Sequence, residues 1–152
     1  MHLYIEDIYL DELKEFTEKL DKVSKDEEIN IYICSNWWAV PIMEQYLRII
    51  NKLENPCSVF AYKISSCAFE LFRKINKPKD LSTGAYSVYH AMSWEIDMMN
   101  KDIAKWKSGK FKLSILKDIE PLPFLTDEEN NDYVQWNDIY LGEERLRTIF
   151  WI

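Results

Sequence analysis

Glycine is scarce in this sequence, which has only Gly84, Gly109 and Gly142 among 152 residues. Loops that cradle phosphate groups need closely spaced glycines, because their backbone N–H groups must approach the ligand. No P-loop and no dinucleotide-binding loop can therefore be built. This absence excludes most nucleotide enzymes.

Residues that bind metals are also few. The chain has three cysteines in no CxxC pair and two histidines: Cys34, Cys57, Cys67, His2 and His90. We therefore expect no zinc site and no cofactor. An odd number of cysteines among apolar neighbours is typical of reduced core thiols in a reducing compartment.

No apolar run approaches the ~20 residues that a membrane span needs. The N-terminal stretch MHLYIEDIYLDE is acidic where a signal peptide would be basic. We therefore expect a cytoplasmic protein with no membrane partner. The net charge of −7 and a pI near 4.9 argue against a nucleic-acid partner, because binding phosphates needs clustered Lys and Arg.

The composition is that of a globular protein, with 47% hydrophobic, 14% aromatic and 30% charged residues. Its length predicts one domain, residues 1–152. Strand-like and helix-like segments alternate along the first half: strands at 3–10, 29–34 and 57–62, and helices at 11–23, 41–53 and 67–75. This alternation predicts an α/β fold of right-handed βαβ units with a mostly parallel sheet.

The second half is more varied. We expect a polar loop at 77–84, a strand at 85–89, a long helix at about 93–107, helical turns at 110–117 and 126–133, and an extended link at 138–141. Thr126 and Glu129 have the spacing of a capping box. The apolar end of the chain, 147–152, should be buried.

The most informative stretch is VFAYKISSCAFELF, residues 59–72, where a strand stops on Ser65 and Ser66 and a helix begins at once. Such a turn puts a hydroxyl beside free backbone N–H groups and the positive end of a helix. That environment suits a serine nucleophile. The alternative is that one of the two serines is an ordinary N-cap.

A nucleophilic serine needs a general base and a carboxylate that orients it. His90 follows the next predicted strand, and parallel strands end at the same sheet edge, so Ser66 and His90 can approach each other. The alternative for a single histidine is a structural role.

Four runs together resemble the proteolytic subunit of the Clp protease, ClpP: INIYICSNWWAVPIMEQYL, VFAYKISSCAFELF, AYSVYH and NDIYLGEE. The resemblance implies that Ser66 is the nucleophile and that His90, 24 residues later, is the general base. It implies that Asp138, a further 48 residues on, orients the base, with Asp132 as the alternative acid. Ser65 and Cys67 occupy neighbouring positions that are usually Ala and Met in this family.

The sequence departs from the family at Trp37 and Trp38, which stand where ClpP has a glycine pair. The resemblance implies that the backbone N–H groups of Trp37 and Cys67 form the oxyanion hole. The two indoles would disturb that hole or close the substrate groove, pack at a subunit contact, or line a new substrate pocket. The segment after His90 also departs from the family.

The resemblance implies a ClpP/crotonase-like spiral of repeated ββα units, with helix 93–107 as an oligomerisation element. The implied function is a serine endopeptidase subunit that cleaves unfolded polypeptides inside a homo-oligomeric ring, fed by an AAA+ unfoldase. The first alternative is a catalytically weakened or inactive structural or regulatory subunit, because the glycine pair is lost. An acyl-CoA enzyme on the same fold is a weaker alternative, since its site does not need Ser, His and Asp.

Overall fold

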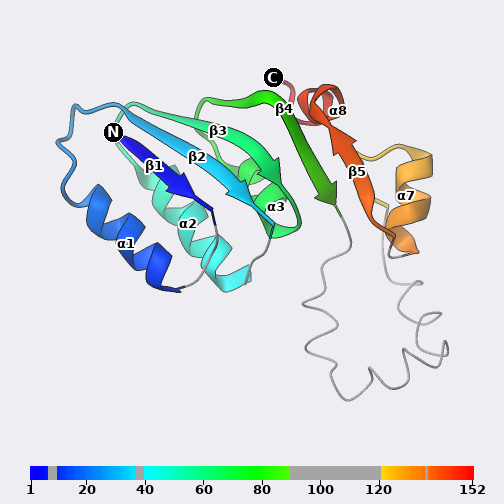
Figure 1. The fold of residues 1–152 in the computed structure, drawn as a ribbon, viewed down its shortest axis with the longest axis horizontal. Helices are drawn as coiled ribbons and strands as arrows, with labels where there is room; N and C mark the ends of the chain where they lie inside the picture. The colour runs from blue at the N-terminus through cyan, green and yellow to red at the C-terminus, as the bar shows by residue number, and fades with distance from the viewer. Residues whose placement is uncertain (7–9, 37–39, 90–120, 136) are drawn as a thin grey trace, which may run out of the picture. The chain divides into compact units, whose positions relative to one another are not determined.

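The computed structural model describes residues 1–6, 10–36, 40–89, 121–135 and 137–152. Within these residues a five-stranded sheet has the strand order β1-β2-β3-β4-β5 (Figure 1). The first four strands pair in parallel. The strands are β1 (His2–Ile5), β2 (Ile29–Ser35), β3 (Cys57–Ile64), β4 (Lys79–Tyr89) and β5 (Ile139–Gly142).

Helices alternate with the strands through the first half of the chain. The helices are α1 (Leu10–Leu20), α2 (Val40–Lys52), α3 (Cys67–Lys74), α7 (Asp127–Val134) and α8 (Glu143–Phe150). The predicted α/β fold with a mostly parallel sheet flanked by helices is confirmed.

The core lies between the sheet and helices α1, α2 and α3, which lie on the same side of β1, β2 and β3 in Figure 1. Alternate residues of β2 point toward these helices and are almost completely buried: Ile29, Ile31 and Ile33. The helices also contact one another, because the rings of Phe16 on α1 and Tyr46 on α2 pack edge to face at 5.1 Å. Burial of these side chains is the main stabilising contribution to this part of the chain.

The chain divides into two compact units. One comprises Met1–Val88 and Tyr140–Ile152, and the other comprises Tyr89–Ile139. In the second unit the ring of Tyr89 stacks on Tyr133 at 5.8 Å and meets Phe124 edge to face. The single domain expected for residues 1–152 stays a prediction.

Two predicted boundaries at the start of the chain and around β4 are wrong. The first strand ends at Ile5, not at Leu10, which begins α1 and is 69% exposed. The segment expected as a loop at 77–84 joins β4 from Lys79 onward. Its start is held by the Lys79 ammonium, which donates to the carbonyl oxygens of Phe72, Arg73 and Ile75 at the end of α3. No local pattern shows that contact.

The end of the chain forms an unexpected helix, α8. Of the apolar end residues, Ile149 and Phe150 are buried as expected, and Phe150 packs against Phe69 and Phe72 of α3. Trp151, at 92% exposure, and Ile152 are exposed, which contradicts the expectation for 147–152. The reason is that Trp151 has left-handed backbone angles and ends the helix, so the chain turns away from the core.

Cys34 is exposed, contrary to the expectation of three core thiols, whereas Cys57 and Cys67 are buried. The alternation of β2 explains the difference, since Cys34 points to the face opposite Ile33 and Ser35.

The capping box of α7 is confirmed: the Glu129 N–H donates to Thr126 Oγ1, and the Thr126 N–H donates to Glu129 Oε2. Residues 93–107 and 110–117, where further helices were expected, lie outside the described residues. In the part of the chain that the structure describes, no helix has the length and apolar character needed to cross a bilayer.

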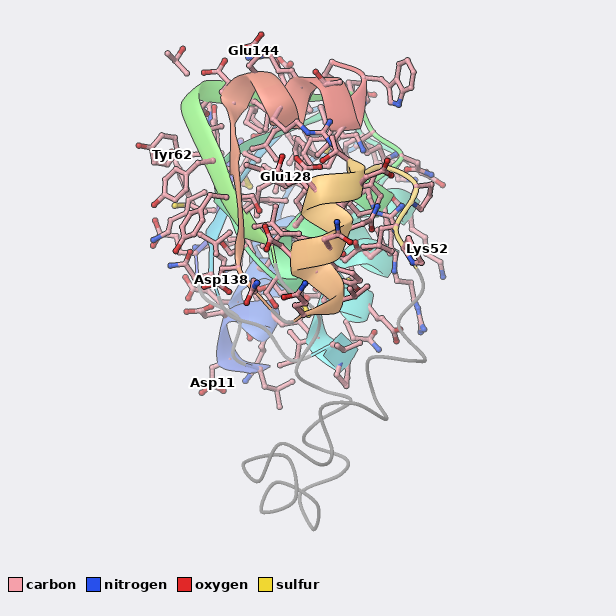
Figure 2. The ribbon with its side chains drawn as sticks, turned by 90° about the vertical axis from the view of Figure 1, so that its right-hand side faces the viewer. Asp11, Lys52, Tyr62, Glu128, Asp138 and Glu144 are labelled. Carbon is pink, nitrogen blue, oxygen red and sulfur yellow. The ribbon has the colours of Figure 1, made fainter. Side chains whose placement is uncertain are left out.

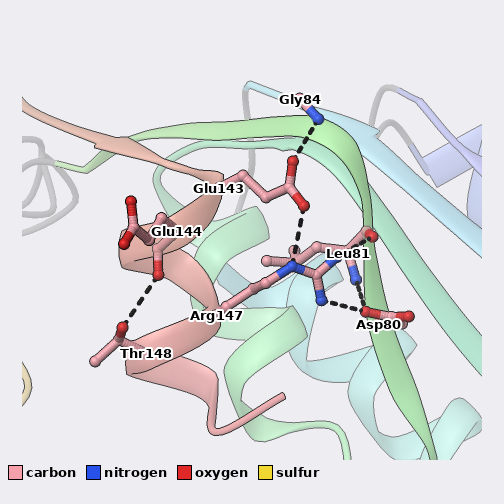
Figure 3. Close-up of polar contacts among 7 residues, drawn as sticks. All are labelled: Asp80, Leu81, Gly84, Glu143, Glu144, Arg147 and Thr148. Atoms are coloured by element: carbon pink, nitrogen blue, oxygen red, sulfur yellow. Dashed lines mark hydrogen bonds and ion pairs between the residues drawn. The ribbon is translucent and has the colours of Figure 1, made fainter.

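Helix α8 is joined to β4 by a polar cluster of three side chains (Figure 3). Arg147 donates through Nη1 to Asp80 Oδ1 at 2.7 Å, and through Nη2 to the Leu81 carbonyl at 3.0 Å. It also donates through Nε to Glu143 Oε1, while Glu143 Oε2 accepts the N–H of Gly84 at 2.6 Å. This cluster fixes α8 to the first half of β4.

Candidate active site

The turn between β3 and α3 has an unusual backbone. Ser66, the last residue before α3, has φ 55° and ψ −127°, a region that residues with a side chain rarely adopt. Such strain persists only where the surrounding structure holds it, and it is found mainly at functional sites. A strained strand-to-helix turn of this kind presents a serine hydroxyl in the nucleophile elbows of α/β-hydrolases.

Hydrogen bonds tie this turn to both neighbouring strands. The Ser65 N–H donates to the carbonyl of Ser35 at the end of β2, at 3.1 Å. The Ser66 N–H donates to the Val88 carbonyl in β4 at 3.4 Å, and the Val88 N–H donates to Ser65 Oγ at 3.1 Å. The ends of three parallel strands therefore meet at the two serines, as expected for a site at the carboxyl edge of a parallel sheet.

The two serines differ in what their hydroxyls can do. Ser65 is 5% exposed and its Oγ accepts the Val88 N–H, so this oxygen is committed to the fold. Ser66 is partly exposed, and although it occupies the N-cap position of α3, its side chain makes no capping hydrogen bond. Ser66 is therefore the N-cap of α3 by position but its hydroxyl does not cap the helix, which makes Ser66 the better candidate for the nucleophile.

Cys67, the first residue of α3, lies directly beside this hydroxyl. Its thiol is buried, and burial raises its pKa, while a hydrogen bond with the Ser66 side chain lowers it by a smaller amount. The net rise keeps the sulfur protonated at neutral pH, so the thiol is a poor nucleophile. Because the Cys67 thiol is buried and Ser66 is partly exposed, Ser66 has the more accessible of the two side chains.

The first turns of α3 are held by their own backbone and by one buried carboxylate. The Ala68 N–H donates to the Ser65 carbonyl at 3.0 Å, and the Phe69 N–H donates to the Ser66 carbonyl at 3.1 Å. Glu70 is 6% exposed and accepts from Nε and Nη2 of Arg73, the shortest distance being 2.7 Å. A buried carboxylate in this bidentate geometry is well satisfied, so Glu70 stabilises α3 and is not a free general base.

The structure does not test the remaining predicted site residues. His90 and Trp37 lie outside the described residues. In the sequence, His90 is two positions after Val88, and Trp37 is two positions after Ser35. Asp138 is exposed and directly precedes β5; it is labelled in Figure 2. It belongs to the unit Tyr89–Ile139, whereas Ser66 belongs to the other unit. The roles of His90, Trp37 and Asp138 stay predictions.

The alternative acid, Asp132, already has a local partner. Its Oδ1 accepts a hydrogen bond from Asn137 Nδ2 at 3.0 Å, and its carbonyl accepts the Asn137 N–H. These bonds hold the residues that follow α7 against the last turn of the helix. The Asp132 carboxylate therefore has a structural role at the end of α7.

Sequence reasoning missed the roles of Ser35, Ser65 and Val88 in building the turn. The only local signal was the pair of serines at the end of a strand, because the partners come from residues far away in the sequence. For metals, the described residues contain no group of three or more His, Cys, Asp or Glu side chains able to hold an ion.

No protein-family model matches this sequence, and no curated protein is similar enough to count as a match. Solved structures with a similar fold do exist. The ClpP protease catalytic domain from Plasmodium falciparum is 17% identical, with a TM-score of 0.62 over 99% of this chain and 82% of that one. This chain has the ClpP fold.

Two further structures agree. A ClpP1 mutant from Listeria monocytogenes is 14% identical with a TM-score of 0.58, over 97% of this chain and 86% of the other. A peptidase from Plasmodium falciparum is also 14% identical with a TM-score of 0.58, over 100% and 91% of the two chains. At these identities the likeness concerns the fold, and the predicted ClpP-like fold is confirmed. Activity depends on the site and is argued below.

Proposed function

We propose that this chain is a ClpP-like serine endopeptidase subunit that cleaves unfolded polypeptides. The observation that carries the proposal is the backbone of Ser66, a strained non-glycine residue at a strand-to-helix turn where three parallel strand ends meet. Ser66 is also the serine whose side chain is not committed to capping α3. The ClpP fold of the whole chain supports this assignment.

The proposed chemistry follows the serine-histidine-aspartate pattern. His90 takes the hydroxyl proton while Ser66 Oγ attacks the peptide carbonyl carbon, and Asp138 orients the imidazole. The backbone N–H groups of Trp37 and Cys67 stabilise the negative oxygen of the tetrahedral intermediate. His90 then gives its proton to the leaving amine. Water hydrolyses the acyl-serine ester by the same steps, which regenerates Ser66.

We also propose that the chain acts as a homo-oligomeric ring fed by an AAA+ unfoldase. The support is the ClpP fold together with the sequence resemblance, and residues 93–107 are the proposed oligomerisation element. Sedimentation of the purified full-length chain tests the ring. A monomer at micromolar concentration would contradict it.

Active-site labelling tests the activity. The purified full-length protein is treated with a fluorophosphonate probe, and the modified residue is located by mass spectrometry. We expect the adduct on Ser66 and its loss in Ser66→Ala. Ser58→Ala, which removes a hydroxyl from the other end of β3, is the matched control and should label normally. Absence of an adduct in the folded wild-type protein would contradict the peptidase proposal.

The second candidate is a catalytically weakened or inactive structural or regulatory subunit. The specific observation in its favour is that Trp37 and Trp38 replace a glycine pair, and loss of one oxyanion donor typically lowers a rate by ~10² to 10³. This candidate predicts little labelling of the wild type and a large gain when both tryptophans are replaced by glycine. The peptidase proposal predicts labelling without that replacement.

A further inference from the structure

The backbone pairing of β3 and β4 ends before the serine turn. The last paired residues are Lys63 and Tyr86, and the β3 chain then leaves the sheet to enter α3. In a parallel ladder, one residue bonds two residues of the partner strand. Its N–H donates to the carbonyl of one, and its carbonyl accepts the N–H of the residue two positions later on that strand. Val88 keeps both bonds although the partner strand has stopped.

The Ser65 hydroxyl completes the ladder. Val88 donates its N–H to Ser65 Oγ at 3.1 Å, and its carbonyl accepts the N–H of Ser66 at 3.4 Å. A side-chain oxygen thus replaces the carbonyl that a continuing strand would present. This replacement lets the backbone turn into α3 while β4 stays attached to the same two residues.

The surroundings leave no simple substitute for this acceptor. Ser65 is 5% exposed and Val88 is partly buried, so water has limited access to the bond. Removing the hydroxyl would leave the Val88 N–H without its protein acceptor and would weaken one of the two bonds that hold β4 to the turn. The neighbouring residue Ser66 depends on that turn for its φ of 55°.

We infer that Ser65 is a positioning residue for Ser66: its Oγ holds the Val88 N–H and so fixes the strained turn that presents the Ser66 hydroxyl. This inference rests on the proposed function, because it assigns Ser65 a role in acylation of Ser66. Small displacements of a reacting group lower rates strongly even when binding is unchanged. Ser65→Ala should therefore lower the acylation rate constant about 10-fold, the equivalent of one hydrogen bond.

The experiment uses the full-length protein and two measurements. Fluorophosphonate kinetics separate the acylation rate constant, kinact, from the binding constant, KI. Amide hydrogen exchange in peptides spanning 85–89 reports on the Val88 N–H without requiring activity. Ser65→Ala is compared with Ser65→Cys, which keeps the shape but has a weaker acceptor, and with Ser65→Thr, which keeps the hydroxyl.

Ser87→Ala is the matched control. Ser87 is 1% exposed and neighbours Val88, but its Oγ has no hydrogen-bond partner among the residues that the structure describes. We expect Ser65→Ala and Ser65→Cys to exchange faster at 85–89 and to lose kinact with little change in KI. Ser65→Thr should recover most of kinact, and Ser87→Ala should resemble the wild type.

The two proposals fail in different ways. Wild-type kinact in a folded Ser65→Ala or Ser65→Cys protein would overturn the positioning role and leave the peptidase proposal intact. A lower kinact without faster exchange at 85–89 would also overturn it, because the effect would not pass through Val88. A wild-type protein that exchanges slowly at 85–89 but forms no Ser66 adduct would overturn the peptidase proposal, and the role of Ser65 in acylation with it.

Discussion

Arg147 and Asp80 form an ion pair across 67 residues of sequence, with Arg147 Nη1 donating to Asp80 Oδ1 at 2.7 Å. The pair joins α8 to β4, and a second Arg147 bond to the Leu81 carbonyl strengthens its geometry. The hydrogen bond from Arg147, followed by the one from the Leu81 N–H, lowers the pKa of Asp80 below its ordinary value of 3.8. The charged form of Asp80 is therefore the one that the folded state favours.

The lowered pKa of Asp80 predicts acid sensitivity at this join. A carboxylate whose pKa is lower in the folded state contributes stability above its unfolded pKa and loses it as the pH falls through the folded pKa. We expect the free energy of unfolding of the wild type to fall as the pH drops below 3.8. In Asp80→Asn, which has no carboxylate to protonate at this position, that fall should be smaller. Urea unfolding at several pH values measures this. Identical pH profiles for the two proteins would contradict it.

The strain at Ser66 predicts that the fold tolerates glycine at this position better than alanine. Ser66→Gly should be more stable than Ser66→Ala by about 1 kcal/mol, because only glycine adopts a positive φ without a steric penalty. Both variants should lose the serine adduct. Urea unfolding compares the two proteins. The control pair is Ser87→Gly and Ser87→Ala in β4, where glycine should instead be the less stable residue by about 0.5 to 1 kcal/mol.

Gly84 has φ 76°, and its N–H donates to Glu143 Oε2. Among the described residues, an added Cβ would meet only Tyr62 Cε2 at 4.0 Å, so strain and not collision decides the outcome. We expect Gly84→Ala to destabilise the fold by about 1 to 2 kcal/mol. Thermal and urea unfolding test this value.

The comparison for Gly84 is Gly142, the N-cap of α8, which has φ −78°. In the part of the chain that the structure describes, no atom lies within 4 Å of a Cβ added there. Gly142→Ser should be neutral or slightly stabilising, because serine is a good N-cap. Equal losses of stability at the two glycines would show that the backbone conformation of Gly84 is not the cause.

The two candidate acids are separable by substitution. Under the peptidase proposal, Asp138→Asn should lower the rate of Ser66 labelling on the order of 10⁴-fold, since an asparagine fixes the wrong tautomer of the base. Asp132→Asn should leave the rate nearly unchanged, because its carboxylate serves Asn137 at the end of α7. Labelling rates of the two variants under one condition decide between them. The reverse order would assign Asp132 as the acid.

The thiols should react in the order of their exposure. Cys34 is exposed, whereas Cys57 and Cys67 are buried and burial raises the pKa of both thiols. Brief treatment of the native protein with a maleimide should give a single adduct, which Cys34→Ser abolishes. Denatured protein should give three adducts. Rapid native modification of Cys67 would contradict its buried position beside Ser66.

Much of the fold could be predicted because its signals are local. The β-branched run of β2, the helical spacing in α1 and α2, and the capping box of α7 all arise from neighbouring residues. The start of β4 could not be predicted, because Lys79 is held by carbonyls of α3 and Asp80 by Arg147. The same holds for Trp151, whose exposure follows from the way α8 ends.

For the site, the sequence by itself determined that a strand gives way to a helix at two adjacent serines, and from its residues alone either serine was a candidate. The tertiary structure distinguishes their environments: β4 supplies the Val88 N–H that occupies Ser65 Oγ, and the backbone of Ser66 takes a strained turn. The physical reason is distance along the chain. Apolar periodicity is repeated within a few residues, whereas the hydrogen bonds that join residues 35, 65 and 88 exist only once the strands pair.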